Sequence, residues 1–422
     1  MGRLYSATAL VLVNLMLLLA ITNAVIWAFL PRETPPKTAA DYARAWLIDA
    51  YGFDRLARAY PDWTRGELRA FLYETSNWVN EFEPFTQFRM KPRRDRFITV
   101  GEHGFREGPD QAPWPPRADA VNVFVFGGST TLGAGLPDHQ TVPAWMSSFL
   151  RDCAKPVAIY NFGRGFFLST QERVLFEQLL MAGHVPANAV FIDGLNDFHY
   201  AQGVPQWTTE LRAMMTQTHG APRLNDRKPA ATMGEALRDF AVATPLGRLA
   251  ARLNELSPPE RFDPASDPAR VPAFGPAMVV PESAPSSIPV DAAALDRARP
   301  AAERLEANWR MIRTLSREYG VRASFVLQPV PTHGYDLRYL NVYEGKFELF
   351  GDHVNSAGGY QLLAQRHAAG GFGADVLWLG DMTKGRHENL FVDSVHYTSA
   401  FARDVAQRIV EHLTASGTLA CR

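Results

Sequence analysis

The chain has 422 residues, 46% of them hydrophobic and 21% charged, a composition typical of a globular protein with a substantial core. The formal net charge of −1 at pH 7 excludes a strong whole-protein field toward nucleic acid, and we expect no nucleic-acid partner. With only two cysteines, a disulfide-rich scaffold and a cysteine-based zinc cluster are excluded as well.

An apolar stretch near the start of the chain is long enough to cross a bilayer. Residues 7–30 carry no charged side chain, and about 20 apolar residues suffice to span the hydrocarbon core. We therefore expect a single-pass anchor, which together with a Pro-rich spacer occupies residues 1–36. A cleaved signal peptide is the alternative, because the residues around Ala24 offer a cleavage site.

A region of helices, short strands and loops is predicted between the anchor and residue 118. Helical periodicity runs through residues 40–75, and residues 76–115 are rich in aromatic and turn-forming side chains. We assign residues 37–118 to this N-terminal region.

From residue 119 onward, apolar strand-like runs alternate with helical patterns. The runs are short and continuous, as expected of strands that helices cover on both faces. They predict an α/β fold with a doubly wound, five-stranded parallel sheet in a domain that extends to residue 422. The predicted strands lie at residues 122–126, 156–162, 188–194, 321–329 and 374–381.

An insertion interrupts the alternation at about residues 198–300. It combines helical pieces with a Pro-rich tract, and a long stretch of this kind within a compact domain is typical of a lid or a disordered segment. The helix that resumes the alternation is predicted to begin at residue 301, directly after Pro300.

Polar residues with catalytic chemistry follow several of the predicted strands. They are Ser129 after the first strand, Asn161 to Phe166 after the second, Asn196 after the third, and Asp393 and His396 after the fifth. Because the carboxyl ends of parallel strands meet at one edge of a sheet, we expect these side chains to lie close together.

Ser129 follows a glycine pair that suits either a phosphate-binding loop or a displayed nucleophile. A P-loop requires a lysine that this stretch lacks, and the dinucleotide fingerprint Gly-x-Gly-x-x-Gly is also absent from it. A serine nucleophile needs a base, an orienting acid and oxyanion donors, all of which the chain offers at the same edge. We therefore expect Ser129 to act as a nucleophile.

Four short motifs, in this order, resemble those of the SGNH (GDSL-like) hydrolase family. The motifs are Gly127-Gly128-Ser129, Asn161-x-Gly163, Gly194-x-Asn196-Asp197 and Asp393-x-x-His396. Residue 128 is glycine where the family often has aspartate. The resemblance covers about residues 120–415 apart from the insertion, and it implies an SGNH or flavodoxin-like sheet of order 2-1-3-4-5.

The resemblance implies a catalytic role for each motif. Ser129 would attack an ester carbonyl, His396 would act as the base, and Asp393 would orient the imidazole. The oxyanion would be bound by the backbone N–H of Ser129, the Asn196 amide, and a backbone N–H of Gly165 or Phe166. The family usually has glycine at the position of Phe166, where a positive φ would strain phenylalanine.

Two further residues are candidates for substrate contact. His199 follows the third motif, and Gln328 ends the fourth strand at the same edge of the sheet. The remaining histidines, such as His353, lie in predicted loops without carboxylates at metal-ligand spacing. We therefore expect no metal and no other cofactor.

The resemblance and the anchor together imply a membrane-anchored serine esterase. Its substrate would be an acyl ester, such as the O-acetyl groups of a cell-envelope polysaccharide. An O-acyltransferase that works through the same acyl-serine intermediate is one alternative, and a non-catalytic binding or scaffold protein is the other.

We place the anchor in the inner (cytoplasmic) membrane and the catalytic domain in the periplasm. In a sheet of order 2-1-3-4-5, the first and last helices of the domain run parallel on one face. This arrangement makes a disulfide between Cys153 and Cys421, which follow those helices, one hypothesis, and two free thiols are the alternative. A disulfide agrees with an oxidising compartment.

Overall fold

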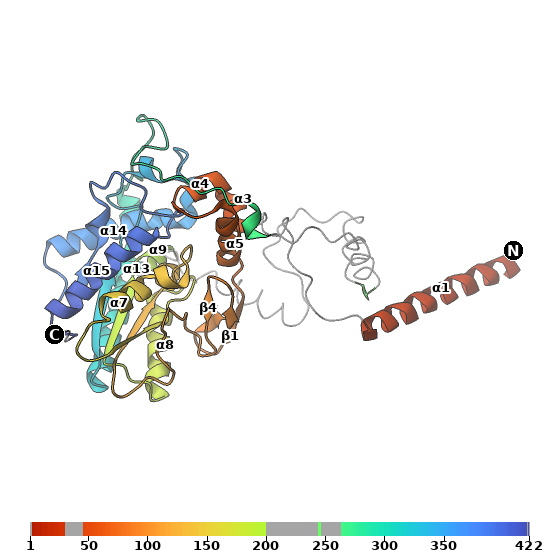
Figure 1. The fold of residues 1–422 in the computed structure, drawn as a ribbon, viewed down its shortest axis with the longest axis horizontal. Coiled ribbons are helices and arrows are strands. Elements are labelled where there is room, and N and C mark those ends of the chain that lie inside the picture. Colours follow the sequence, from red (N-terminus) through yellow and green to blue (C-terminus); the bar gives the residue numbers. More distant parts are fainter. Residues whose placement is uncertain (1, 30–44, 200–243, 246–262, 420, 422) are drawn as a thin grey trace. The chain divides into compact units, whose positions relative to one another are not determined.

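The computed structural model describes residues 2–29, 45–199, 244–245, 263–419 and 421 (Figure 1). The chain divides into one unit of residues 1–42 and 223–263 and a second unit of residues 43–222 and 264–422. Most of the expected insertion lies outside the described residues, so its helical pieces and its role as a lid stay predictions. The two domain boundaries proposed from the sequence, after residues 36 and 118, also stay predictions.

The first unit contains a long apolar helix, α1 (Gly2–Phe29). Its 28 residues extend for about 42 Å at the usual helical rise. The segment Thr8–Val25 has a mean hydropathy of 2.2 and no buried residue, so its length and composition suit a single membrane span. A signal sequence close to an N-terminus has the same properties, and the choice between the two stays a prediction.

A five-stranded, all-parallel sheet forms the centre of the second unit. Its strands are β5 (Val121–Gly127), β6 (Val157–Asn161), β7 (Asn188–Asp193), β8 (Arg322–Leu327) and β9 (Val376–Trp378). They pair in the order β6-β5-β7-β8-β9, which is the predicted order 2-1-3-4-5. The expected fold class is therefore confirmed.

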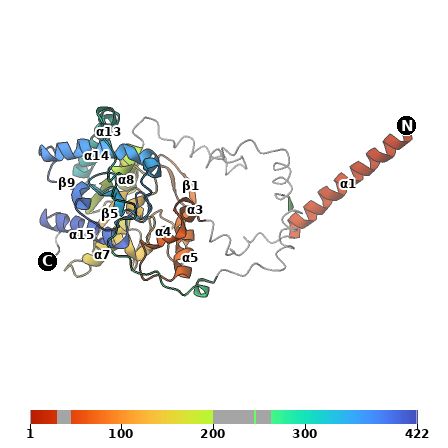
Figure 2. The same ribbon diagram turned by 90° about the horizontal axis from the view of Figure 1, so that it is seen from above.

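Helices cover both faces of this sheet because successive side chains of a strand point to opposite sides. Val123 and Val125 of β5 share one apolar cluster with α7 (Val142–Phe149) and α15 (Ser399–Ala415). Phe124 and Phe126 share the other with α8 (Ser169–Met181), α13 (Ala292–Glu318) and α14 (Asn355–Ala368). Figure 2 shows α13 and α14 on one side of β5 and α7 and α15 on the other.

The helix α13 begins nine residues earlier than expected, at Ala292. The prediction was wrong because it placed residues 292–300 in the insertion, whereas the helix continues through Pro300. A proline inside a helix removes one backbone hydrogen bond. The real start is set by Asp291, whose carboxylate accepts a hydrogen bond of 2.7 Å from the Ala294 N–H as an N-cap.

The two cysteines form a disulfide, which decides between the two alternatives that the sequence left open. Cys153 follows α7 and Cys421 follows α15, and these two helices pack side by side on one face of the sheet. The bond closes a loop of 268 residues, so it links the start of the sheet domain to its end.

The N-terminal region belongs to the same compact unit as the sheet. Its helices are α3 (Trp46–Tyr51), α4 (Phe53–Ala57) and α5 (Arg65–Ser76). Its strands form two hairpins, β1 (Asn80–Glu83) with β2 (Gln87–Met90) and β3 (Arg93–Arg94) with β4 (Thr99–Val100). Leu68, Phe71 and Leu72 of α5 are fully buried in the apolar cluster that also contains Val392, so the region packs close to the Asp393 loop.

Candidate active site

Ser129 lies at the carboxyl end of β5, where the chain turns into the short helix α6 (Ser129–Leu132). The residue before it, Gly128, approaches Asn196 so closely that a Cβ at residue 128 would lie 2.3 Å from Asn196 Nδ2. An aspartate, which the family often has here, would collide with that amide. The glycine is therefore required by the position of Asn196, and Ser129 is displayed at the edge of the sheet.

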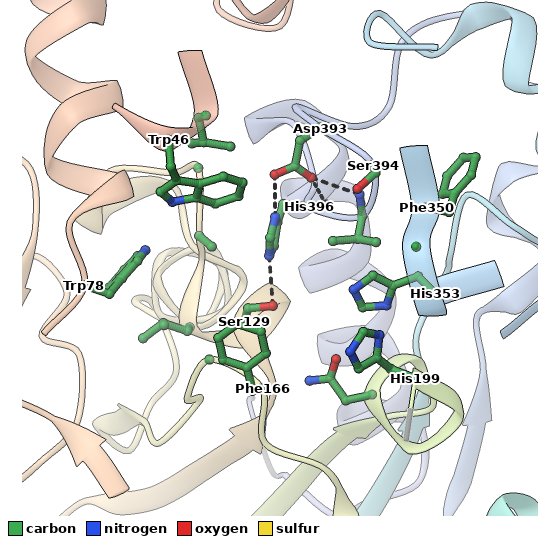
Figure 3. A pocket seen from close by; sticks show the side chains of 18 of the residues that line it. Trp46, Trp78, Ser129, Phe166, His199, Phe350, His353, Asp393, Ser394 and His396 are labelled. Carbon is green, nitrogen blue, oxygen red and sulfur yellow. Dashed lines mark hydrogen bonds and ion pairs between the residues drawn. The ribbon is translucent and has the colours of Figure 1, made fainter. Parts of the chain in front are cut away.

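Ser129, His396 and Asp393 form a continuous chain of hydrogen bonds (Figure 3). Ser129 Oγ lies 2.8 Å from His396 Nε2, and His396 Nδ1 lies 2.7 Å from Asp393 Oδ2. The other carboxylate oxygen, Asp393 Oδ1, accepts hydrogen bonds of 2.9 Å from the backbone N–H groups of Val395 and His396. One short loop thus delivers both the base and the acid in a fixed orientation.

The surroundings of Asp393 keep this buried carboxyl group ionised. Burial by itself would raise its pKa, but His396 and the two backbone N–H groups outweigh burial and lower the pKa below its usual value. An ionised Asp393 can stabilise an imidazolium on His396, which is what a general base requires from its partner.

The N-terminal region braces the loop that carries the acid. Tyr51 Oη lies 3.2 Å from Ser394 Oγ, next to Asp393 in the chain. Burial and the charge of Asp393 raise the pKa of Tyr51 to about 12, so the hydroxyl stays protonated at neutral pH. Thr75 and Tyr60 also bind the loop after α6, where Thr75 Oγ1 accepts from Gly135 N and Tyr60 Oη donates to Gly135 O.

Asn196 lies in α9 (Leu195–His199), directly after the end of β7. Its Nδ2 donates a hydrogen bond of 2.7 Å to the carbonyl of Phe167. A side-chain amide carries two N–H groups, and Asn196 lines the same cavity as Ser129. The position suits an oxyanion donor, and that role stays a prediction.

The second motif departs from the family pattern in a specific way. Phe166 adopts a φ of 65°, the left-handed conformation that favours glycine, whereas Gly165 has no positive φ. A non-glycine residue in this conformation costs roughly 1–3 kcal/mol. Both residues line the cavity with Ser129, and the half-exposed ring of Phe166 forms part of its wall. The role of their N–H groups as oxyanion donors stays a prediction.

Backbone and side-chain hydrogen bonds attach the second motif to the serine turn. Asn161 Nδ2 donates to the carbonyl of Thr131 at 3.0 Å, and Asn161 Oδ1 accepts from Gly163 N at 3.0 Å. Arg164 N donates to the carbonyl of Gly127 at 2.9 Å. Asn161 is therefore a structural residue that holds two catalytic segments together.

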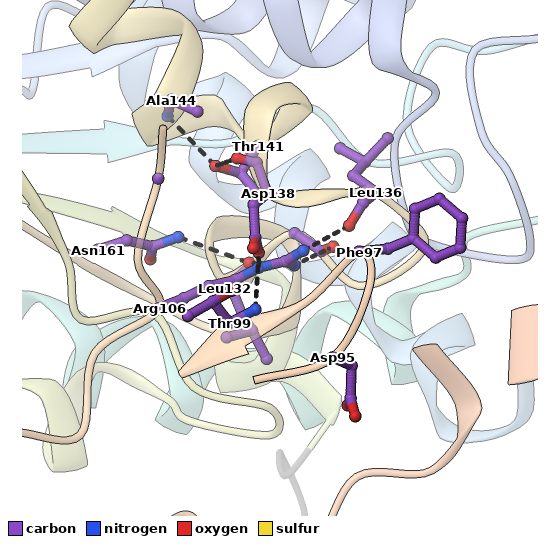
Figure 4. Close-up of polar contacts among 12 residues, drawn as sticks. Asp95, Phe97, Thr99, Arg106, Leu132, Leu136, Asp138, Thr141, Ala144 and Asn161 are labelled. Atoms are coloured by element: carbon purple, nitrogen blue, oxygen red, sulfur yellow. Dashed lines mark hydrogen bonds and ion pairs between the residues drawn. The ribbon is translucent and has the colours of Figure 1, made fainter. Parts of the chain in front are cut away.

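A buried arginine from the N-terminal region supports the same turn (Figure 4). The Arg106 guanidinium donates to the carbonyls of Leu132, Gly133 and Leu136 at 2.6–2.9 Å and to Asp138 Oδ1 at 2.8 Å. Only 1% of Arg106 is exposed. This role could not be predicted from the sequence, because a single arginine outside any motif carries no local signal.

A cavity of about 420 Å³ opens above Ser129. The N-terminal region supplies one wall, with Trp46 and Trp78, and the opposite wall holds His199 and His353 (Figure 3). The cavity also contains Asn196, Asp393 and His396, so it brings together the expected catalytic residues. Its size lies in the range of small-molecule sites.

The two residues expected to contact substrate have different positions. His199 lines the cavity, as expected. Gln328 does not, because its side chain is buried and its Oε1 accepts a hydrogen bond of 2.8 Å from Thr130 Oγ1. The expectation that Gln328 contacts substrate is therefore corrected: the residue supports the segment behind the serine.

His353 belongs to the cavity although the sequence analysis placed it in an ordinary loop. Its ring lies against that of His199, with centroids 4.3 Å apart. The segment Phe347–Val354 bends at Gly351 and carries His353 to this position. Burial, together with nearby His199 and His396, lowers the pKa of His353 to about 3, so the ring is neutral. Within the described ranges, no His, Cys, Asp or Glu side chains are grouped as a metal site, and the absence of a metal stays a prediction.

No protein-family model and no curated protein sequence matches the chain. Three solved structures are similar over about two thirds of it. A protein of the G-D-S-L family from Desulfitobacterium hafniense DCB-2 aligns with 69% of this chain and 99% of its own, at 8% identity and a TM-score of 0.34. The acetyl xylan esterase AlAXEase aligns over 68% and 98%, at 13% identity and a TM-score of 0.32. A carbohydrate acetylesterase family member from Sinorhizobium meliloti aligns over 71% and 99%, at 12% identity and a TM-score of 0.30. At these identities and TM-scores, the similarities do not assign a function to this chain.

Proposed function

We propose that the protein is a serine esterase of the SGNH type. The observation that carries the proposal is the unbroken hydrogen-bond chain from Ser129 through His396 to Asp393, with contacts of 2.8 and 2.7 Å. A serine hydroxyl is a weak nucleophile until an adjacent base removes its proton. The pKa of the acid is lowered, as the orienting role requires.

The geometry supports a two-step reaction. Ser129 Oγ attacks the ester carbonyl carbon while its proton passes to His396 Nε2, and the tetrahedral intermediate collapses as that proton moves to the leaving alcohol. Water then attacks the acyl-serine, again gives a proton to His396, and the carboxylic acid leaves as Ser129 regains its proton. Asp393 stays ionised throughout and stabilises the imidazolium.

The negative charge on the intermediate is stabilised at the edge of the sheet. The backbone N–H of Ser129, the second N–H of the Asn196 amide and one N–H of the Gly165–Phe166 turn are the proposed donors. Removal of one such donor typically raises the barrier by about 2.7–4 kcal/mol.

We propose an acyl ester of a cell-envelope polysaccharide as the substrate, for example an O-acetyl group. Trp46 and Trp78 offer flat apolar surfaces beside the serine, and neutral His199 and His353 offer hydrogen-bonding groups opposite them. The disulfide supports a catalytic domain outside the cytosol. With α1 as an anchor, the enzyme would act at the periplasmic face of the inner membrane.

A fluorophosphonate probe tests the nucleophile directly. The full chain in detergent should be labelled, Ser129→Ala should not, and Ser148→Ala, a matched change on an exposed position of α7, should be labelled as the native protein is. Labelling of Ser129→Ala at the native rate would refute the assignment of the nucleophile. No labelling of a folded native protein would favour the scaffold alternative.

A panel of acyl esters then identifies the reaction. Release of free acid from an acetylated glycan, lost in His396→Ala, supports hydrolysis. Transfer of the acyl group to an added glycan in preference to water would instead show an O-acyltransferase, which uses the same acyl-serine intermediate.

A further inference from the structure

Three carboxyl groups lie buried behind the turn that carries Asn196, and the proposed reaction uses none of them. Glu172 lies near the start of α8, Asp193 ends β7, and Asp197 lies in α9. Their exposed fractions are 1%, 3% and 1%, respectively. All three line a space of about 10 Å³ that is separate from the Ser129 cavity. Burial of this much potential negative charge requires an explanation.

The hydrogen bonds leave two carboxyl oxygens without a donor. Asp197 Oδ1 accepts 2.6 Å from Ser169 Oγ, and Asp193 Oδ2 accepts 2.9 Å from Trp309 Nε1. Asp193 Oδ1 and Glu172 Oε2 are shielded from solvent and receive no hydrogen bond from a donor group in the described part of the chain. Both residues border the same small space.

Among the residues that the structure describes, no positively charged side chain pairs with these two oxygens. Arg304 of α13, which faces the cluster, donates 3.1 Å to the backbone carbonyl of Asp197. The hydroxyl of Tyr360 on α14 donates to the carbonyl of Gln328. The charged groups that act on Glu172 are therefore Asp193 and Asp197, and Tyr360 and Arg304 lie near these two aspartates. A proton on one carboxyl group would satisfy both orphan oxygens, because a protonated carboxyl donates and an ionised one accepts.

We propose that Glu172 keeps a proton at neutral pH and uses it to donate a hydrogen bond to Asp193. This hydrogen bond positions the turn that carries Asn196. Glu172 is the partner that holds the proton because Asp193 and Asp197 each accept from a neutral side-chain donor through one oxygen. Burial, followed by the charges of Asp193 and Asp197, raises the pKa of Glu172 well above its usual range.

The shared proton and the Asn196 amide connect the same two segments. Asn196 Nδ2 donates to the carbonyl of Phe167, and Glu172 follows that loop by one helical turn of α8. The turn between Asp193 and Asn196 is tightly packed, since a Cβ at Gly194 would lie 2.5 Å from Tyr360 Oη. Loss of the proton would leave Glu172 and Asp193 both negatively charged, and their repulsion would displace Asn196. Glu172 is thus a positioning residue, and its kinetic effect rests on the proposed function.

The pH dependence of ester hydrolysis tests the effect on catalysis. With 4-methylumbelliferyl acetate and the Ser129→Ala protein as the blank, kcat of the native full chain should fall at alkaline pH as Glu172 ionises. Glu172→Gln keeps a donor for Asp193 but cannot ionise, so it should keep most of kcat at pH 7 and lose the alkaline fall. Glu172→Leu removes the donor and should lower kcat more than it changes KM, by no more than the ~10²–10³-fold cost of a lost oxyanion donor.

Glu177→Gln is the matched control, because Glu177 lies on the same helix, is partly exposed and pairs with Arg173. This variant should keep the native pH profile. An alkaline fall in Glu172→Gln equal to that of the native protein would overturn the proposal, and so would a native profile that stays flat at alkaline pH.

An infrared measurement tests the proton itself without relying on activity. The Ser129→Ala protein at pH 7 should show a protonated-carboxyl C=O band that disappears in the Ser129→Ala, Glu172→Gln double variant. Equal bands in the two proteins would overturn the proposal even if the protein is an esterase. A band that is present and lost as expected, in a protein that hydrolyses no ester, would support the shared proton and reject the proposed function instead.

Discussion

Replacement of Gly128 by alanine should lower the rate of ester hydrolysis without lowering the stability of the fold. Gly128 has a φ of −81°, which any residue adopts, so alanine introduces no backbone strain. Its Cβ would lie 2.3 Å from Asn196 Nδ2 and 3.2 Å from the Phe167 carbonyl, against an ordinary contact of 3.4–4 Å. The amide nitrogen must therefore move away by about 1 Å before its distance from the new Cβ reaches 3.4 Å, the lower end of ordinary contact. Because the amide is the end of a side chain, its movement should leave the rest of the fold unchanged. The same movement takes the proposed oxyanion donor away from its position beside Ser129.

A displacement of this size should lower kcat by about 10²-fold, the effect of a 1 Å misplacement or of one lost oxyanion donor. The measurement is kcat and KM for 4-methylumbelliferyl acetate together with the thermal midpoint, and we expect kcat to fall while the midpoint changes little. Gly128→Asp, which introduces the residue that the family often has, should be at least as impaired. Gly275→Ala is the matched control, because a Cβ there meets no atom within 4 Å. A Gly128→Ala protein with kcat within threefold of native would refute the role of Asn196.

Three further predictions concern stability and pH. Arg106→Met leaves Asp138 and three backbone carbonyls without their buried partner, and should destabilise the fold by about 3–5 kcal/mol, measured as a lower midpoint of thermal or urea unfolding. Cys153→Ala opens a loop of 268 residues and should cost about 2–4 kcal/mol, with no further loss when a reductant is added to the variant. The pKa of Asp393 is lowered in the folded protein, so its ionised form stabilises the fold above the ordinary carboxyl pKa, and this contribution is lost as the pH falls through the lowered value. The stability difference between the native protein and Asp393→Asn should therefore shrink on acidification, and a difference that grows instead would contradict the argument.

The sheet and the placement of the catalytic residues could be predicted because both depend on local patterns. Buried parallel strands appear as continuous apolar runs, and their carboxyl ends mark where Ser129, Asn196 and His396 meet. Gln328 was misassigned because the end of a strand does not determine which way its last side chain faces. The sequence indicates that a residue lies at this edge of the sheet. Whether its side chain faces the cavity or the segment behind Ser129 depends on tertiary packing.

The parts that the sequence could not predict depend on contacts between distant segments. Arg106 acts on carbonyls about 30 residues away, and nothing beside it in the chain marks it as buried. His353 reaches the cavity through a bend at Gly351 within a segment of short turns. Trp46 and Trp78 looked like ordinary members of a helical and loop-rich region, and their place in the cavity wall depends on tertiary packing alone.

The N-terminal wall of the cavity has a practical consequence for how this protein can be divided into fragments. A fragment cut at residue 119, where the sheet domain begins, would keep Ser129, Asp393 and His396 but lose Arg106, Tyr51 and the two tryptophans. Such a fragment would expose these three residues to bulk water on one side. Any activity measured on it would be that of a site with one wall missing. The shortest piece that retains the complete cavity begins ahead of Ala45, soon after the predicted anchor in the sequence, so a truncation that removes the anchor has to end before that residue.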